Sequence, residues 1–426
     1  MNITIGRSRP LVGEFQVPGD KSVSHRALML SALADGTSEI LGLLEADDTE
    51  STAHCLQQLG VKINRKGLAT LVEGRGLSGL SQPKEDLDAG NSGTTMRLLS
   101  GILAGQPFRS TLTGDDSLRK RPMNRVIEPL SRMGAKLEAS TSGTPPVTIH
   151  GKKPLQPIEY QLPVPSAQVK SAIILAGLFA DGTTRVIEPV LSRDHTERML
   201  GLDIETGKRG RSIRVGGGMT IPPRQYRVPG DISSAMFLIC AALLVPKSEI
   251  FIRNAGLNPT RTRALDLLGS VGAKIRIEGV EEISGEPYGT VSAAFSHLKG
   301  EVRIDPSTIP LVIDEIPVLA ATLAVAGCAF EVRGAGELRH KESDRISAIV
   351  RNLREMSVAV EEYPDGFAFE SKKTVLPAIV ETSGDHRIAM AFAVAGMALD
   401  GGMAIPDPEV ASISFPGFWD SIRRFQ

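Results

Sequence analysis

The sequence predicts an α/β protein made of two similar lobes, each built of three β-α-β-α-β-β repeats. The prediction rests on a helix–strand unit that occurs six times and on a Val-Pro-Gly-Asp segment that occurs twice, at Val17 and at Val228. A chain of 426 residues is too long for one ordinary hydrophobic core, so two or three domains are expected.

Each copy of the unit opens with a turn and small or polar residues, followed by an apolar helix, a second turn and a β-like run. A recurrence of this kind is typical of a supersecondary element that is used several times in one fold. The six copies begin at Gly19, Gly90, Pro165, Gly230, Ile313 and Gly384.

A second pattern supplies the other helix and strand of the repeat. Runs with apolar residues three and four positions apart, as in a helix with one buried face, end in short motifs that open a strand. These motifs are LGVKI at Leu59, MGAKL at Met133, VGAKI at Val271 and, more weakly, MSVAV at Met356. The segment after ERML in the third unit is short, so we expect one helix to be trimmed there.

The two Val-Pro-Gly-Asp segments indicate where the chain passes between the lobes. We expect residues 18–228 to form one lobe, and residues 1–17 with 229–426 to form the other, closed by the N-terminal strand. Hinges are expected near Val17–Gly19 and Arg227–Gly230. A coincidental alternation of helices and strands is the alternative, and six aligned copies argue against it.

The composition excludes several classes of protein. Hydrophobic residues are 41% and charged residues 23%, and the net charge of -1 gives no overall attraction to nucleic acid or membrane. The cysteines Cys55, Cys240 and Cys328 are too far apart for a CxxC pair, which favours a reducing cytosol over a disulfide framework. The N-terminus resembles no targeting peptide, and the longest apolar runs are shorter than the roughly 20 residues of a membrane span.

Polar and basic side chains gather where the repeated helix begins. A helix N-terminus favours anions, whereas a cation there opposes the helix dipole. Cations in several copies therefore indicate an anionic ligand shared among helix ends; N-capping and solvated surface charge are the alternatives. The residues are Lys21, Ser22, Arg26, Asn91, Ser92, Gly93, Arg97, Ser166, Gln168, Lys170, His386 and Arg387, with basic clusters at 119–121 and 339–345.

Other site motifs fit poorly. Asp20 stands where a P-loop needs glycine before its lysine, and the GxGxxG pattern at 74–79 is followed by Pro83 and a polar run instead of a helix. His54 and Cys55 share one amphipathic helix and are interpreted as packing residues. The histidines show no metal-ligand spacing, so no metal is expected.

Eight segments resemble the signature segments of the 3-phosphoshikimate 1-carboxyvinyltransferase (EPSP synthase) family and follow the family's order. They are PGDKSVSHRALML, GNSGTTMRLLSG, LTGDDSLRKRPM, PVPSAQVKSAIILAGL, SRDHTERML, IDEIPVLA, ELRHKESDRI and SGDHRIAMAFAVAG. The resemblance implies two lobes of inverse α/β barrel type with the active site in the cleft between them. It implies transfer of the enolpyruvyl group of phosphoenolpyruvate to the 5-hydroxyl of shikimate 3-phosphate, in the shikimate pathway to chorismate and the aromatic amino acids. We expect a cytoplasmic monomer that needs no cofactor.

The resemblance also implies which matched residues bind the substrates. Lys21, Ser22 and Arg26 are expected to contact both, and Asn91 is expected in the same site. Shikimate 3-phosphate is expected at Ser166, Ala167, Gln168, Ser192, Arg193 and, on its phosphate side, Lys341. Phosphoenolpyruvate is expected at Gly93, Arg121, Gln168, Arg345 and Arg387, since the planar fork of arginine suits phosphate and carboxylate.

The reaction, an addition–elimination through a tetrahedral intermediate, needs a base, an acid and stabilising cations. By resemblance Asp314 is the candidate base and an anchor for the shikimate hydroxyls. Glu342 and Lys21 are the proton-transfer candidates, with His386 nearby. The sequence leaves the division of these roles open, and a helix N-cap function of Asp314 is compatible with catalysis.

The sequence departs from the family pattern near its C-terminus and at Ala167, where some members have serine. Many members carry a lysine shortly before the C-terminal Phe-Pro pair, where this chain has Ser412 and Ile413. We therefore expect either weaker binding of phosphoenolpyruvate or another cation in place of the lysine. Gly93 is retained, which predicts sensitivity to glyphosate, a mimic of phosphoenolpyruvate.

Two rival functions use similar features. The UDP-N-acetylglucosamine enolpyruvyl transferases share the fold but typically carry a cysteine on a mobile loop, where this chain reads LRKRPM, and they lack KESDR. A non-catalytic protein that binds phosphorylated metabolites, or an inactive relative, would use the same helix ends. Such a binding protein would have no need of Asp314 and Glu342.

Overall fold

The computed structural model describes residues 2–372 and 374–426, which fold into two compact units. Unit 1 consists of the chain up to Pro18, Gly230–Glu281 and Pro287–Gln426, and unit 2 consists of Gly19–Pro229 and Glu282–Glu286. The two boundaries at which the chain passes between the units, after Pro18 and after Pro229, each lie one residue later than the sequence suggested. The assignment of Glu282–Glu286 to unit 2 was not foreseen; the bond between His195 Nδ1 and Glu286 Oε1, 2.8 Å long and buried, holds this segment there.

Unit 2 contains three four-stranded sheets with one common order. In each sheet the first two strands are parallel and the others antiparallel. The sheets are β14(Gln225–Arg227)-β3(Thr37–Leu41)-β5(Ala69–Glu73)-β4(Lys62–Lys66), β6(Leu87–Asp88)-β7(Arg109–Thr113)-β9(Val147–His150)-β8(Lys136–Glu138) and β10(Glu159–Gln161)-β11(Thr183–Glu188)-β13(Gly210–Gly216)-β12(Ile204–Gly207). Strand β14 lies near the C-terminal end of the segment Gly19–Pro229 and completes the sheet formed by the first strands of that segment.

The helices of unit 2 follow the two sequence patterns. The repeated apolar helix forms α1(Lys21–Leu33), α3(Gly93–Ala104) and α5(Ala167–Gly177), and the amphipathic one forms α2(Asp47–Gln58), α4(Asn124–Arg132) and α6(His195–Leu200). Helix α6 has only 6 residues, in line with the expected trimming. The basic cluster at 119–121 does not open α4, because Leu118–Lys120 forms a separate 3-10 turn before it.

Unit 1 repeats this plan twice in full and once in reduced form. Its four-stranded sheets are β2(Val12–Phe15)-β15(Glu249–Gly256)-β17(Glu286–Ala294)-β16(Lys274–Ile283) and β18(Glu301–Ile304)-β19(Ala329–Val332)-β21(Gly366–Phe369)-β20(Val360–Tyr363). Within the described residues, the sixth repeat has only β1(Ile3–Ile5) paired with β22(Met403–Ile405), extended by a bridge between Ile379 and Ala404. The helix α13(Phe418–Arg423) follows β22 near the C-terminus.

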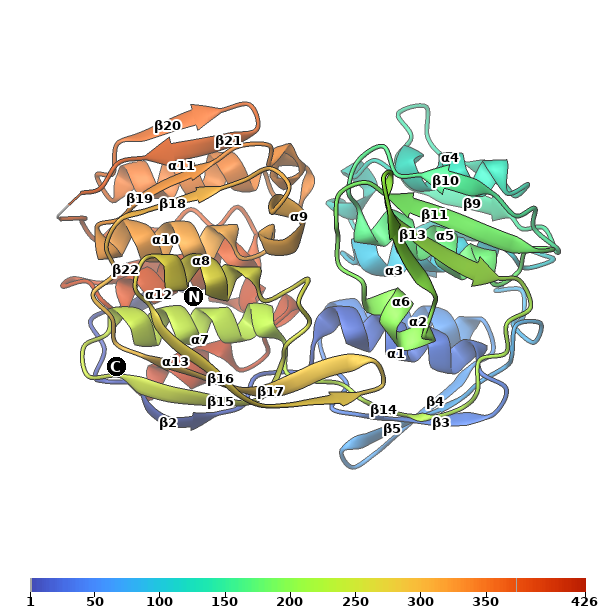
Figure 1. Ribbon diagram of the computed structural model, residues 1–426, viewed down its shortest axis with the longest axis horizontal. Helices are drawn as coiled ribbons and strands as arrows, with labels where there is room; N and C mark the ends of the chain where they lie inside the picture. Colours follow the sequence, from blue (N-terminus) through green and yellow to red (C-terminus); the bar gives the residue numbers. More distant parts are fainter. Residues whose placement is uncertain (1, 373) are drawn as a thin grey trace. The chain divides into compact units, whose positions relative to one another are not determined.

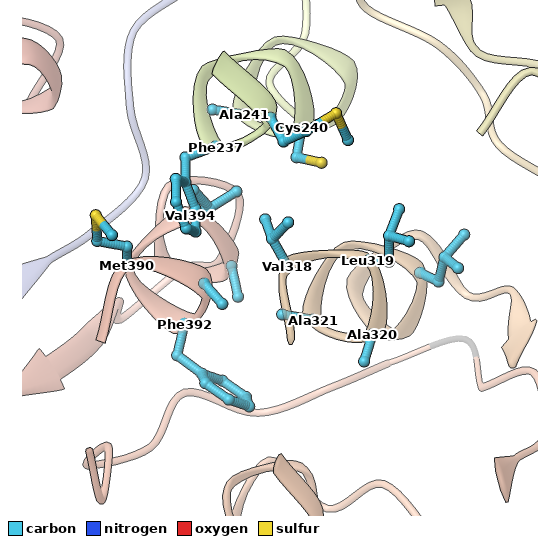
Figure 2. Close-up of a cluster of buried hydrophobic side chains, with 14 of the residues drawn as sticks. Phe237, Cys240, Ala241, Val318, Leu319, Ala320, Ala321, Met390, Phe392 and Val394 are labelled. Carbon is cyan, nitrogen blue, oxygen red and sulfur yellow. The ribbon is translucent and has the colours of Figure 1, made fainter. Parts of the chain in front are cut away.

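Three apolar helices form the core of unit 1: α7(Ile232–Leu244), α10(Ile316–Ala326) and α12(His386–Gly396). A helix that is apolar on all sides is stable only when it is covered all round. Figure 2 shows side chains such as Phe237, Val318 and Val394 between the three helices, and all three residues are buried. The sheets lie outside these helices (Figure 1). The remaining helical segments are α8(Arg263–Ser270), α9(Ile309–Val312), α11(Arg345–Glu355) and the 3-10 turns η2(Gly336–His340) and η3(Pro408–Ile413).

The sheets of both units are open. Their strand orders are linear, so among the described residues no sheet closes into a barrel. None of the helices in the described part of the chain combines the length and apolar character needed to cross a membrane.

Candidate functional site

The candidate site residues lie where the central helices begin. Lys21, Gly93, Ala167 and His386 are the first residues of α1, α3, α5 and α12, and Arg345 is the first residue of α11. The preceding residue caps each helix by accepting a hydrogen bond from a backbone N–H of the first turn. The sequence folds this way because Asp and Ser, the capping residues here, are preferred helix caps. The uncapped N–H groups and the positive ends of the helix dipoles favour anions at these positions.

At the start of α1, Lys21 is paired and partly accessible. Its Nζ lies 3.0 Å from Asp48 Oδ2 on α2, and its side chain keeps 15% of its exposed area. The sequence analysis did not identify Asp48. The pair holds the ammonium group in place without removing it from contact with solvent or ligand.

Arg26 lies deeper in unit 2 than Lys21. It donates from Nε to Thr196 Oγ1 at 2.7 Å, from Nη2 to Ser171 Oγ at 2.8 Å and from Nη1 to Ser22 O at 2.9 Å. Burial lowers the pKa of Arg26 to about 10, against the opposing effect of Glu197, so the group remains a cation at neutral pH. Each guanidinium nitrogen is thus engaged by the protein, and Arg26 joins α1 to α5 and α6.

Two arginines flank the start of α3. Arg121 donates from Nη2 to Asn91 Oδ1 at 2.7 Å, and Asn91 donates to Asp115 Oδ2 at 2.6 Å. Arg97 donates from Nη1 to Gln168 Oε1 at 2.9 Å. A β-carbon placed on Gly93 would lie 2.6 Å from Arg97 Nη1 and 3.3 Å from Arg121 Nη1. The glycine therefore leaves room for both guanidinium groups at a helix N-terminus, an arrangement suited to a phosphate or carboxylate.

The residues expected to hold shikimate 3-phosphate lie around the start of α5 and on the segment before α6. Ser166 caps α5 by accepting a bond from Val169 N at 3.4 Å, which leaves its hydroxyl proton available to an acceptor. Ser192 is buried and bonded to Glu188. The charge of Arg193 acts on Arg26 and lowers the pKa of that group further.

A second cluster, in unit 1, surrounds Arg345. Its Nε lies 2.7 Å from Asp385 Oδ2, its Nη2 2.6 Å from Glu342 Oε2 and its Nη1 3.2 Å from Asp314 Oδ1. Burial lowers the pKa of Arg345, but the carboxylates of Asp385, Glu342 and Asp314 together raise it above its ordinary value. In Asp385, burial raises the pKa and the charge of Arg345 lowers it, with a net shift below the ordinary range.

Asp314 lies among three cations of this cluster. Besides Arg345, Arg387 donates from Nη1 to the Asp314 carbonyl oxygen at 3.1 Å, and its Nε lies 3.7 Å from Asp314 Oδ1. Lys341 Nζ lies 3.8 Å from the same carboxylate oxygen. His386 is buried at the start of α12. Carboxylates and cations thus alternate here, which permits both anion binding and proton transfer.

The C-terminal segment offers no cation at the position of the absent lysine. Ser412 belongs to η3 and donates its hydroxyl to Glu409 O at 2.8 Å, while Phe415 is buried in the core. The cations that the structure brings together around Asp314 are Lys341, Arg345 and Arg387. In the described residues, no group of three or more His, Cys, Asp or Glu side chains is placed to hold a metal ion.

Sequence reasoning missed the partners that hold the cations. Asp48, Asp385 and Glu188 received no role, and Arg97 was noted only as a polar residue at a helix start. Asp385 had a usable signal, because it directly precedes His386 and Arg387 at the expected N-cap position. Asp48 and Glu188 had none, because their partners lie in other elements of the repeat.

Comparisons with known proteins agree on one family. A profile of the EPSP synthase (3-phosphoshikimate 1-carboxyvinyltransferase) family matches residues 5–422. A 3-phosphoshikimate 1-carboxyvinyltransferase of Solibacter usitatus is 48% identical over 100% of this chain and 99% of its own length, and one of Thermus thermophilus is 49% identical over 97% and 96%. The solved structure of EPSP synthase from Acinetobacter baumannii is 40% identical, with a TM-score of 0.86 over 100% of this chain and 98% of that one.

Proposed function

The chain belongs to the EPSP synthase family, and from this premise we propose that the clusters in its two units bind the substrates and carry the protons of that family's reaction. The reaction transfers the enolpyruvyl group of phosphoenolpyruvate to the 5-hydroxyl of shikimate 3-phosphate and releases phosphate, as a step of the shikimate pathway. The observation that carries the proposal is the gathering of cations, with carboxylates beside them, at the N-termini of α1, α3, α11 and α12.

Phosphoenolpyruvate is assigned to the arginine groups. Gly93 leaves space beside Arg121, and Gln168 is bonded to Arg97, so a phosphate or carboxylate at the start of α3 meets two guanidinium groups and backbone N–H donors. Arg345 and Arg387 are the corresponding groups of unit 1. Bidentate arginine bonds to anions are short and strong, which supports this assignment.

Shikimate 3-phosphate is assigned to the hydroxyl, amide and basic groups around α5. Ser166 and Ala167 begin that helix, so the Ser166 hydroxyl and the first backbone N–H groups suit a phosphate. Ser192, Arg193 and Lys341 complete the set. Both substrates are proposed to be bound by Lys21, Ser22, Arg26 and Asn91. Arg26 contributes mainly by fixing the first turn of α1 through its hydrogen bond to the Ser22 carbonyl oxygen.

The proton transfers are assigned to carboxylates and Lys21. In the addition step the 5-hydroxyl loses its proton as its oxygen bonds to C2 of phosphoenolpyruvate, while C3 gains a proton. In the elimination step C3 returns that proton as the bond to the phosphate oxygen breaks. Asp314 is proposed as the base and shikimate anchor, and Glu342 and Lys21 as the groups that exchange a proton with C3. His386 is a further candidate for proton transfer.

We also propose that the protein works as a monomer in the cytoplasm. The three cysteines are buried and unpaired with one another, which fits a reducing compartment.

The proposed function is tested by phosphate release from purified protein without added metal. Release is expected only when phosphoenolpyruvate and shikimate 3-phosphate are both present. Release with UDP-N-acetylglucosamine as the acceptor would instead indicate the activity of the rival transferases. No release with either acceptor would indicate a non-catalytic binding protein.

A further inference from the structure

A fully buried ion pair lies beside the proposed shikimate 3-phosphate residues. Lys170 of α5 places its Nζ 2.7 Å from Glu188 Oε1, at the end of β11, and both side chains are 0% exposed. Glu197 of α6 approaches the same Nζ to 2.8 Å and is equally buried. Removing three charges from water is costly even when they are paired, so the arrangement needs a reason beyond stability.

Glu188 connects this pair to Ser192. The backbone N–H of Ser192 donates to Glu188 Oε1 at 3.0 Å, and the Ser192 hydroxyl donates to the same oxygen. Lys170 Nζ adds a bond to the Ser192 carbonyl oxygen at 3.4 Å. One ion pair thus contacts the backbone donor, the backbone acceptor and the side chain of a single residue.

The segment that carries Ser192 is held by side-chain bonds, which also include those of Asp194 to Arg198 and Arg211. Residues between β11 and α6 form no helix or strand, so no regular ladder of backbone bonds sets the position of Ser192 or of Arg193. Donors that bind a phosphate act well only when they are held near their bound geometry by groups behind them.

We propose that Lys170 and Glu188 are positioning residues: the pair fixes the Ser192–Arg193 segment and thereby sets the affinity for the phosphate of shikimate 3-phosphate. The inference rests on the proposed function. It predicts an effect on one substrate only, because the bonds recorded for the two side chains of the ion pair run to Ser192 and Glu197 and to none of the residues described here that are assigned to phosphoenolpyruvate.

Glu197 provides a matched control. It lies about as close to Lys170 as Glu188 does and is as deeply buried, but within the described residues no hydrogen bond joins its carboxylate to Ser192. Glu188→Gln and Glu197→Gln therefore each remove one carboxylate charge from Lys170. Only the first alters the group that holds Ser192.

The test compares steady-state constants of both variants with the wild type, together with their melting temperatures. Glu188→Gln is expected to raise KM for shikimate 3-phosphate about tenfold, the loss equivalent to one charge-assisted hydrogen bond, with kcat and KM for phosphoenolpyruvate within about twofold. Glu197→Gln is expected to lower the melting temperature without this selective rise. If Glu188→Gln does not fold, Glu188→Asp keeps the charge beside Lys170, withdraws the carboxylate from Ser192 and carries the same prediction.

Two outcomes would overturn the inference: an unchanged KM for shikimate 3-phosphate in a folded Glu188 variant, or equal rises for both substrates. An inactive wild-type protein would count against the proposed function itself, so the two failures are distinguishable.

Discussion

At the scale of single residues, other side chains of the protein hold the cations of the candidate site in place. Lys21 is held by Asp48, Arg121 by Asn91 and Arg345 by three carboxylates. Such partners reduce the repulsion between neighbouring cations and restrict their side chains to one orientation. An incoming anion therefore meets donors that are already aimed, and loses less binding energy to ordering them.

Gly93→Ala is expected to weaken the binding of phosphoenolpyruvate. The new methyl group would lie 2.6 Å from Arg97 Nη1, so that guanidinium must shift and Arg121 is crowded as well. We expect KM for phosphoenolpyruvate to rise about tenfold, equivalent to one charged hydrogen bond, and inhibition by glyphosate to weaken in parallel. Steady-state kinetics with glyphosate titration measures both.

Gly269→Ala is the control for this substitution. Gly269 also lies in a helix, α8, and a β-carbon there meets nothing within 4 Å. Its kinetics should match the wild type. Unchanged KM and unchanged glyphosate inhibition in Gly93→Ala would show that the arginines at α3 do not bind phosphoenolpyruvate.

The sequence identified the residues at the helix starts but not the bonds among them. Lys21 and Arg345 stood out because a cation at a helix N-terminus needs an explanation. Their partners Asp48 and Asp385 are 27 and 40 residues away along the chain, and only the packing of one repeat element on another brings them together. A single sequence does not show which residues so far apart along the chain come into contact.

At the scale of elements, the central helices are buried so completely that polar groups inside them must stay uncharged or paired. His25 of α1 is one such group, with its Nδ1 2.7 Å from Thr52 Oγ1. Burial, followed by the charges of Lys21 and Arg26, lowers the pKa of His25 well below 6.5.

This shift predicts a loss of stability in mild acid. Below about pH 6.5 the unfolded chain gains a proton on His25 that the folded protein does not accept, so stability falls as the pH decreases toward the folded-state pKa. The slope from this group is about 1.4 kcal/mol per pH unit, and above pH 6.5 it contributes none. Calorimetric melting temperatures of His25→Gln should therefore fall less steeply between pH 6.5 and 5.5 than those of the wild type.

His54→Gln is the matched control, since His54 is exposed on α2 in the same unit; the interpretation of His54 as a packing residue was therefore wrong, while Cys55 is buried as expected. Its melting temperatures should follow the wild type through this range. Parallel curves for wild type and His25→Gln would contradict a neutral, buried His25.

Most elements were predictable because their patterns are local. All six apolar helices begin within a few residues of the expected copies, and the helix that ends with ERML, α6, has only 6 residues. The reduced sixth sheet and the transfer of Glu282–Glu286 to unit 2 were not predictable. Both depend on strands and side chains that meet from distant parts of the chain.

At the scale of the whole molecule, the repeat distributes the chemistry over two units. Unit 2 holds Lys21 and the groups at α3 and α5, while unit 1 holds Asp314, Glu342 and the arginines at α11 and α12. The same supersecondary plan thus places cations at helix N-termini in both units, and the three carboxylates around Arg345 distinguish unit 1. The central claim of the account is that both clusters serve one reaction.

That claim is tested most directly by kcat for phosphate release in Lys21→Ala and Asp314→Ala, one variant from each unit. The controls are Lys62→Ala and Asp266→Ala, which remove exposed members of surface ion pairs. The account predicts that each site variant loses at least about 100-fold in kcat, the usual contribution of a proton-transfer group, while both controls stay within about twofold. A folded Lys21→Ala or Asp314→Ala protein with near wild-type kcat would contradict it, because one cluster would then have no part in the reaction.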